Sequence, residues 1–281
     1  MHRWSRLLRH FSAAEVAVFA LSVFSAGHSV AQPQGSDPSA LAEVRQAVNV
    51  ELDASRTDKS IWTYRESNTT SEKHAVYTAI ETPQGTLRRL TELNSQPLSP
   101  QATATETHRI HNYVNDSSAQ AKARKAGQHD DAQATEMLKM LPDAFIWTRA
   151  GENGDLLTLN FRPNPDFDPP DMQSRVMGIM AGQMIVSKDS HRIRTLRGTL
   201  TDDVLIGFGI LGKLNRGGTF DVERRMVGDG RWQITETHVH IGGHALLFHT
   251  IGQQEDDVKT EWKPSTAKTL QEAEQQLNVG K

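Results

Sequence analysis

Residues 145–161 read FIWTRAGENGDLLTLNF and open a series of short segments, alternating apolar and polar, that continues to Trp262. Alternation with a period of two is typical of half-buried β-strands, and the Asn153-Gly154 pair is a strong hairpin signal. The segments follow one another too closely for crossover helices, so neighbouring strands should be antiparallel. The sequence predicts a mainly β protein (α+β), with a large curved antiparallel sheet or an unclosed β-barrel and a few packing helices.

Similar patterns predict the remaining elements. Strands are expected at residues 61–66, 75–93 (with a turn at 83–85), 184–187, 192–200, 219–226, 232–241, 244–251 and 258–262. Hairpin turns are expected at Asp229-Gly230 and Gly242-Gly243. Apolar residues at helical spacing predict helices at 39–52, around 103–114, at 132–141 with Asp131 as its cap and Pro142 at its end, and from Ser265 to about residue 277. A solvated stretch is expected at 115–131 and a proline-rich loop at 162–171.

The first thirty-one residues have the pattern of a signal peptide. Three arginines precede an eleven-residue apolar run at 16–26, and Ser29-Val30-Ala31 has the small-x-small form of a cleavage site. The run is too short to span a bilayer. We therefore expect an exported, periplasmic or secreted protein, with a signal peptide at 1–31, a flexible leader at 32–38 and a single β-rich domain at 39–281.

Composition excludes several classes of protein. The chain has 281 residues and no cysteine, so it contains neither disulfides nor a lipid-modified N-terminal cysteine. It has 31 Lys and Arg and 34 Asp and Glu; without the predicted signal peptide, which holds three arginines and one glutamate, the net charge is −5. This balance is not the basic footprint of a nucleic-acid-binding protein. The mature part has no apolar stretch long enough to cross a membrane.

No motif predicts catalysis or a cofactor. Residues 207–212 match G-x-G-x-x-G, but no strand–helix–strand unit surrounds them, as a dinucleotide site requires. The apolar residues of 204–214 predict instead a loop that folds into the core or acts as a lid or a membrane-touching lip. There is no G-x-S-x-G elbow for a hydrolase. A non-enzymatic protein is favoured.

Two polar clusters are weak metal candidates. His238 and His240 share one face of a predicted strand and His244 is near, which is a possible zinc arrangement. The competing interpretation is the polar outer face of a sheet. The aspartates of the proline-rich loop, at 166, 168 and 171, are a possible calcium site or an ordinary solvated loop, from which Phe167 could dock back on the sheet.

The order of these elements resembles the lipoprotein localisation factor superfamily, the periplasmic carriers that sort outer-membrane lipoproteins, and the related sigma-regulatory sensors. Residues 161–165 and 203–220 also look like a group of uncharacterised exported bacterial proteins. The resemblance implies an unclosed β-barrel with helices as a lid over an apolar hollow. Such a container has a physical purpose, because a sixteen-carbon tail exposed to water costs on the order of 12 kcal/mol.

The main prediction is therefore a binder or carrier of a lipid, or of the acyl chain of a lipoprotein. An envelope sensory or structural module that binds a protein partner is the alternative, and a histidine-based metal-dependent enzyme is a weaker one. If the sheet curls without being filled, the aromatic strand residues and the apolar loop would line the hollow. These candidate ligand-binding residues are Trp62, Tyr64, Phe145, Trp147, Phe161, Leu205, Phe208, Leu211, Phe220, Trp232 and Phe248.

Overall fold

The computed structural model describes residues 35–206, 212–245 and 249–279. Its strands are β1 (Trp62–Thr70), β2 (His74–Thr82), β3 (Gly85–Leu93), β4 (Gln96–Pro97), β5 (Phe145–Asn153), β6 (Leu156–Pro163), β7 (Met180–Ser187), β8 (Ile193–Leu200), β9 (Val204–Ile206), β10 (Gly212–Leu214), β11 (Thr219–Gly228), β12 (Arg231–Ala245) and β13 (His249–Pro264). Its helices are α1 (Pro38–Thr57), α2 (Pro100–Asn115), α3 (Ser117–Ala144), α4 (Met172–Gly178) and α5 (Leu270–Val279).

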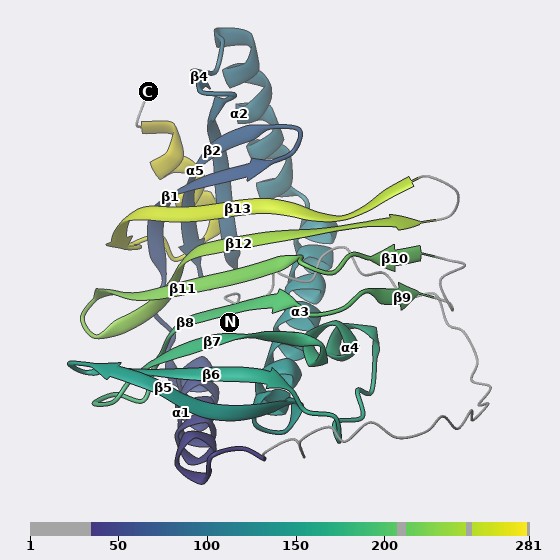
Figure 1. The fold of residues 1–281 in the computed structure, drawn as a ribbon. Coiled ribbons are helices and arrows are strands. Elements are labelled where there is room, and N and C mark those ends of the chain that lie inside the picture. The colour runs from purple at the N-terminus through teal and green to yellow at the C-terminus, as the bar shows by residue number, and fades with distance from the viewer. Residues whose placement is uncertain (1–34, 207–211, 246–248, 280–281) are drawn as a thin grey trace.

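All these strands join one antiparallel sheet (Figure 1). The order across it is β4-β3-β2-β1-β13-β12-β11-β8-β7-β6-β5, and β10 pairs with both β12 and β9. The end strands β4 and β5 do not pair with each other in the described chain, so the sheet stays open. The predicted fold class, a mainly β protein with an unclosed antiparallel sheet and packing helices, is confirmed.

Glycines shape two of the predicted hairpins. Gly154 joins β5 to β6 with φ of 59°, and Gly230 joins β11 to β12 with φ of 74°. A side chain is strained at these angles, so glycine is the residue that allows the tight turn. The turns predicted at residues 83–85, at Asn153-Gly154 and at Asp229-Gly230 are confirmed.

The turn predicted at Gly242-Gly243 is wrong. Strand β12 continues through both glycines to Ala245 and pairs there with β10 and β13. A Cβ atom on Gly243 would lie 2.2 Å from the carbonyl oxygen of Lys213. The glycine is therefore required by the close approach of another backbone and not by a change of direction, a second reason for glycine within a strand.

Two helices differ from the prediction. The stretch at 115–131 is helical, because its Ala, Lys, Arg and Gln residues are strong helix formers even without an apolar stripe. Helix α3 begins after Asp116, whose side chain accepts a hydrogen bond from the Ala119 N–H at 2.9 Å, so Asp131 is not its cap. Pro142 lies within its last turn, and the helix ends at Ala144. Helix α5 begins at Leu270 and not at Ser265, because Thr269 precedes its first turn and its hydroxyl accepts from the Glu272 N–H at 3.1 Å; the Ser265 hydroxyl donates to the Glu81 carbonyl at 2.7 Å.

The helices cover the sheet in two groups. Helices α1, α3 and α4 pack over β5 to β8 and parts of β11 and β12, and enclose the largest hydrophobic core. Helices α2 and α5 pack on β2 and β3 around Ile80, Leu87 and Ile110. Figure 1 shows α3 running behind the strands from α2 towards α1. The core therefore has two main parts, one at each half of the sheet, and a third, smaller cluster around Trp62 and Tyr64.

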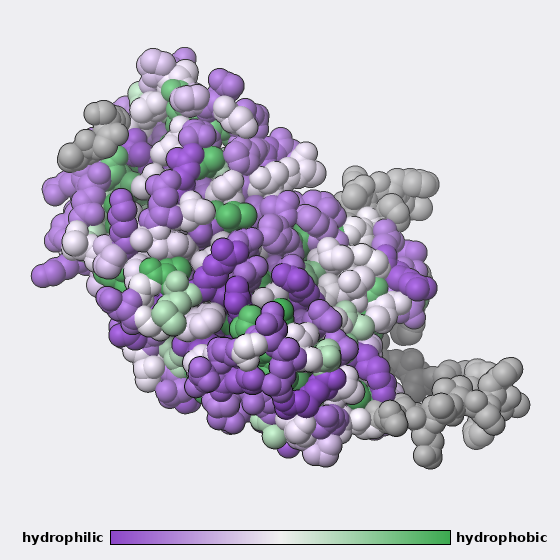
Figure 2. Space-filling model, turned by 60° about the vertical axis from the view of Figure 1, so that its left-hand side comes forward, coloured by the Kyte–Doolittle hydropathy of each residue, from purple (hydrophilic) through white to green (hydrophobic). Residues whose placement is uncertain are grey.

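The outer surface is mainly polar. The face in Figure 2 is largely hydrophilic, with small, separate hydrophobic spots. Among the described residues, the large apolar side chains that are exposed are Leu93, Leu205 and Met226, and they lie on different strands. None of the described helices has the length and apolar character needed to cross a membrane. Apolar surface for a ligand is therefore to be sought inside the molecule.

Candidate ligand-binding cavity

An apolar cavity of about 150 Å³ lies between the sheet and helices α3 and α4. Its walls come from α3 (Ala134, Met137, Leu138, Leu141), α4 (Gln173, Val176, Met177) and seven strands (Phe145, Phe161, Met180, Leu196, Phe220, Val239, Ile241, Gln253). All of these side chains except the two glutamines are apolar. An apolar cavity of this volume can accept a ligand of about the size of benzene.

The α3 wall follows from the helical period. Ala134, Met137, Leu138 and Leu141 recur at spacings of three and four, so they lie on one face, and the predicted burial of this face is confirmed. The last carbonyls of a helix lack partners within it. The indole N–H of fully buried Trp147 donates to the Leu141 carbonyl at 3.0 Å, and this bond fixes the end of α3 against β5.

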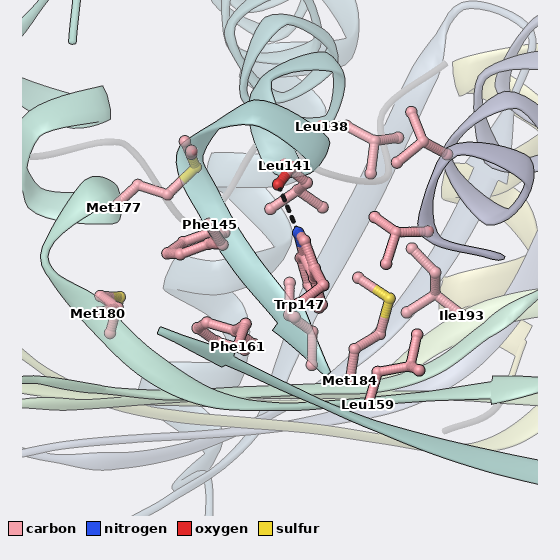
Figure 3. Close-up of a cluster of buried hydrophobic side chains, with 14 of the residues drawn as sticks. Leu138, Leu141, Phe145, Trp147, Leu159, Phe161, Met177, Met180, Met184 and Ile193 are labelled. Atoms are coloured by element: carbon pink, nitrogen blue, oxygen red, sulfur yellow. Dashed lines mark hydrogen bonds between the residues drawn. The ribbon is translucent and has the colours of Figure 1, made fainter. Parts of the chain in front are cut away.

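Three aromatic rings from β5 and β6, those of Phe145, Trp147 and Phe161, lie together below the end of α3, as Figure 3 shows. The ring centroids of Phe145 and Phe161 are 4.6 Å apart, and that of Trp147 lies 5.3 Å from Phe161. Phe145 and Phe161 line the cavity, whereas Trp147 fills the core beside it. Such tilted pairs contribute about 0.5–1.5 kcal/mol beyond their buried area, which stabilises the packing of these rings.

Helix α4 contributes Gln173, Val176 and Met177 to the cavity wall. Asp171 caps this helix by accepting from the Ser174 N–H at 2.7 Å, and the Ser174 hydroxyl oxygen accepts in return from the Asp171 backbone N–H at 3.1 Å. The third aspartate of the possible calcium loop is thus a helix cap, and those at 166 and 168 are exposed. Phe167 packs beside Gly178 and against the core. Sequence reasoning missed α4, and hence Val176 and Met177, because seven residues give no readable period.

Methionines make part of the cavity wall adaptable. Met137, Met177 and Met180 all line it, and Figure 3 shows Met177 and Met180 on the side of the two phenylalanines. Methionine side chains are unbranched and polarizable, so they adjust to ligands of different shape. The cavity wall therefore combines aromatic rings with adaptable methionine side chains.

Of the eight predicted ligand residues that the structure describes, it brings three together. Phe145, Phe161 and Phe220 line the cavity. Trp62 and Tyr64 lie elsewhere, in a separate cluster against Trp262, with centroid distances of 6.2 and 4.6 Å. Their position reflects the sheet order, which places β1 between β2 and β13 and away from β5 to β8.

The other predicted ligand residues are placed as follows. Trp147 is fully buried in the core, Trp232 is half-buried on β12 and does not line the cavity, and Leu205 on β9 is 50% exposed. The apolar stretch at 204–214 forms β9 and β10 at its two ends, with Val204 and Leu214 buried. Phe208, Leu211 and Phe248 lie outside the described residues.

His238 and His240, the first two histidines of the possible zinc site, form an ion-pair cluster with Asp256. They lie on the face of β12 opposite to Val239 and the cavity. Asp256 lies 2.6 Å from Nδ1 of His238 and 3.0 Å from Nε2 of His240. Burial lowers the pKa of His238, but Asp256 and Glu236 outweigh it and hold that pKa above the ordinary value of 6.5. Within the described ranges, no three such side chains are arranged to hold a metal ion. The side chain of His244 lies outside the description.

A buried charge cluster anchors α1 to the sheet. Glu51, only 2% exposed, receives two bonds from Arg192, at 3.0 and 3.1 Å, and one from the Ile193 N–H at 2.9 Å, and it also pairs with Arg224. Burial raises the pKa of Glu51, but the two guanidinium groups outweigh it and keep the pKa below the ordinary value of 4.5. Because all three groups are partnered, the cluster is structural in character.

A second cleft of about 430 Å³ lies between α1 and the β11–β12 turn. Its charged lining residues are Asp53, Asp58, Arg192 and Arg231. Arg192 is engaged by Glu51, and Arg231 lies 3.7 Å from Asp58. Asp53 pairs with Arg56 at 3.4 Å, so the charged side chains that line this cleft are balanced and paired.

No family model, curated protein or solved structure matches this chain. The chemistry of the site is therefore argued from its own geometry. A cavity walled by hydrocarbon, thioether and aromatic groups, with two neutral amides, can bind an apolar group by desolvation.

Proposed function

We propose that the protein is a non-enzymatic binder or carrier of a lipid, or of a lipid-modified protein, that inserts an apolar group between α3, α4 and the sheet. The observation that carries this proposal is the cavity, whose apolar wall has few polar interruptions. A small apolar pocket with a few convergent polar groups is a typical ligand site.

The cavity volume limits what is bound. About 150 Å³ is the volume of a cavity that takes one benzene-sized ligand, or about six carbon atoms. Burying six methylene-sized groups contributes about 5 kcal/mol before the costs of association. A sixteen-carbon acyl chain would therefore place only its end in the cavity and would need further contacts outside it.

Binding of a protein partner is a second candidate, and the filled core favours it. Trp147, Leu159 and Met184 are each 0% exposed, so most of the interior beside the cavity is occupied by the protein's own side chains. A module of this kind would use its surface rather than its interior. It would bind its partner equally well whether or not the cavity is accessible.

We also propose that the protein is exported, on the basis of residues 1–31, which lie outside the described residues. The N-terminal sequence and intact mass of the protein from an envelope fraction would test this. A mature chain beginning near residue 32 is expected. A chain that retains Met1 in the cytoplasm would refute export.

The decisive experiment blocks the cavity without touching the surface. Ala134 is buried and lines the cavity, whereas Ala132, two residues earlier on α3, is exposed. We expect Ala134→Leu to lose binding of a fluorescent apolar probe and to lack any lipid found by mass spectrometry in solvent extracts of the wild type. The matched control Ala132→Leu should retain both. Equal binding by both variants would refute the cavity as the site, and a partner recovered equally by both would favour the second candidate.

A further inference from the structure

The polar residues of the cavity wall limit which polar groups a bound ligand can have. Its two polar lining residues are Gln173 on α4 and Gln253 on β13. Gln253 lies directly across from Ile241, another wall residue, in the β12–β13 pairing. No charged side chain is among the described residues that line the cavity. A polar end of the ligand would therefore meet neutral amides.

The orientation of the Gln253 amide is set by its neighbour. Its Nε2 donates to Oε2 of Glu255 at 2.8 Å, and the other oxygen of Glu255 accepts from Nδ2 of Asn68 at 2.6 Å. A carboxylate offers only acceptors, so the nitrogen of each amide must face it. Because the nitrogen is engaged by Glu255, the Gln253 oxygen is the atom that can accept a hydrogen bond from a ligand.

A carboxylate ligand is disfavoured by the same arrangement. Glu255 lies directly across from Val239, which lines the cavity, and such cross-strand neighbours have Cβ atoms about 4.5–5.5 Å apart. An anionic ligand end would lose its water and approach a like charge, with no cationic side chain on the described wall to compensate.

We infer that Gln253, oriented by Glu255, selects uncharged amphiphiles that carry a hydrogen-bond donor, such as a phenol, an alcohol or a primary amide, over carboxylates. This inference rests on the proposed ligand binding in the cavity and adds the chemistry of the ligand's polar end. Gln253 is the residue that determines specificity, and Glu255 is a positioning residue that acts through it.

Toluene, phenol and benzoate test the inference, because they share one ring and differ in the polar group. Titration calorimetry of the full mature chain should give measurable binding of toluene and phenol and no binding of benzoate. In Gln253→Leu, phenol affinity should fall about fivefold relative to toluene, which is the worth of one neutral hydrogen bond. Gln254→Leu is the matched control, because Gln254 is exposed on the other face of β13 and should leave the ratio unchanged.

A second variant tests the role of the Glu255 charge. Glu255→Gln keeps the size of the side chain and removes its charge, so benzoate binding should become measurable; if this variant also fails to bind benzoate, the role given to Glu255 is overturned. If toluene does not bind the wild type, the proposed cavity function and this inference are both overturned. If toluene binds but the phenol-to-toluene ratio is the same in Gln253→Leu and the wild type, the selectivity inference alone is overturned.

Discussion

Filling the cavity should stabilise the protein while it abolishes binding. The change is Ala134→Leu, on the face of α3 that looks onto Phe145 and Phe161. Most substitutions that remove binding also destabilise the fold. A variant that is more stable but no longer binds the ligand would therefore indicate that the cavity accommodates the ligand's apolar group.

The expected gain follows from the cavity volume. At about 24 cal/mol per Å³, an empty cavity of 150 Å³ represents about 3.6 kcal/mol of forgone stability. Leucine adds three carbon atoms to alanine, and burying each contributes about 0.8 kcal/mol, or about 2.4 kcal/mol together. We expect a net gain of about 2 kcal/mol, which raises Tm by roughly 4–8 °C for a domain of this size.

The assay is thermal unfolding with and without toluene. The wild type should show a Tm that rises with ligand concentration, because the ligand binds only the folded state. Ala134→Leu should start higher and should not respond to toluene, and the exposed control Ala132→Leu should stay within about 0.5 kcal/mol of the wild type. A lower Tm for Ala134→Leu, by the 1–3 kcal/mol or so typical of overpacking, would refute the reasoning, because the space would then not be available.

Three further predictions concern the frame around the cavity. Glu51→Gln leaves two arginines without their buried counter-charge and should lower the free energy of unfolding, measured in urea at pH 7, by roughly 3–5 kcal/mol. Because the pKa of Glu51 is lowered in the folded state, its stabilisation is present above about pH 4.5 and is lost as the pH falls through the folded pKa. A difference in stability between wild type and variant that does not shrink in acid would contradict this prediction. Gly243→Ala should reduce the hydrogen-exchange protection of the paired β10 and β12 amides, because its Cβ would lie 2.2 Å from the Lys213 oxygen. Gly242→Ala should leave this protection unchanged, because a Cβ there has no atom within 4 Å. Equal protection in the two variants would argue against the close approach. An NMR titration should place the pKa of His238 above 6.5. The stabilisation from its ion pair should then be present below pH 6.5 and be lost as the pH rises through the folded pKa. Asp256→Asn should lower the pKa of His238, and an unchanged pKa in this variant would show that Asp256 is not the cause.

Local patterns predicted much of the frame. Alternation identified the long strands, and Asn153-Gly154 marked the first hairpin of the β5–β8 region. The stripe from Ala134 to Leu141 predicted the buried face of α3. Patterns failed where two causes give the same signal. Gly243 was predicted as a turn residue, but it is a glycine because another backbone approaches it. The alanine-rich start of α3 was not predicted as a helix, because it is helical without burying an apolar stripe. Helix α4 was too short to show a period, so its part of the cavity wall was not foreseen.

The sequence alone determined the antiparallel character of the sheet and the alternation of side chains between its two faces, because short turns and a period of two are local properties. Only the tertiary structure decided which of the aromatic residues share a cavity. Phe145 and Phe220 come together while Trp62 and Tyr64 are kept apart, because the pairing order brings β5 to β8, β11 and β12 under α3 and α4 and places β1 beyond β13. That order depends on contacts between residues far apart in the chain, which no local pattern contains.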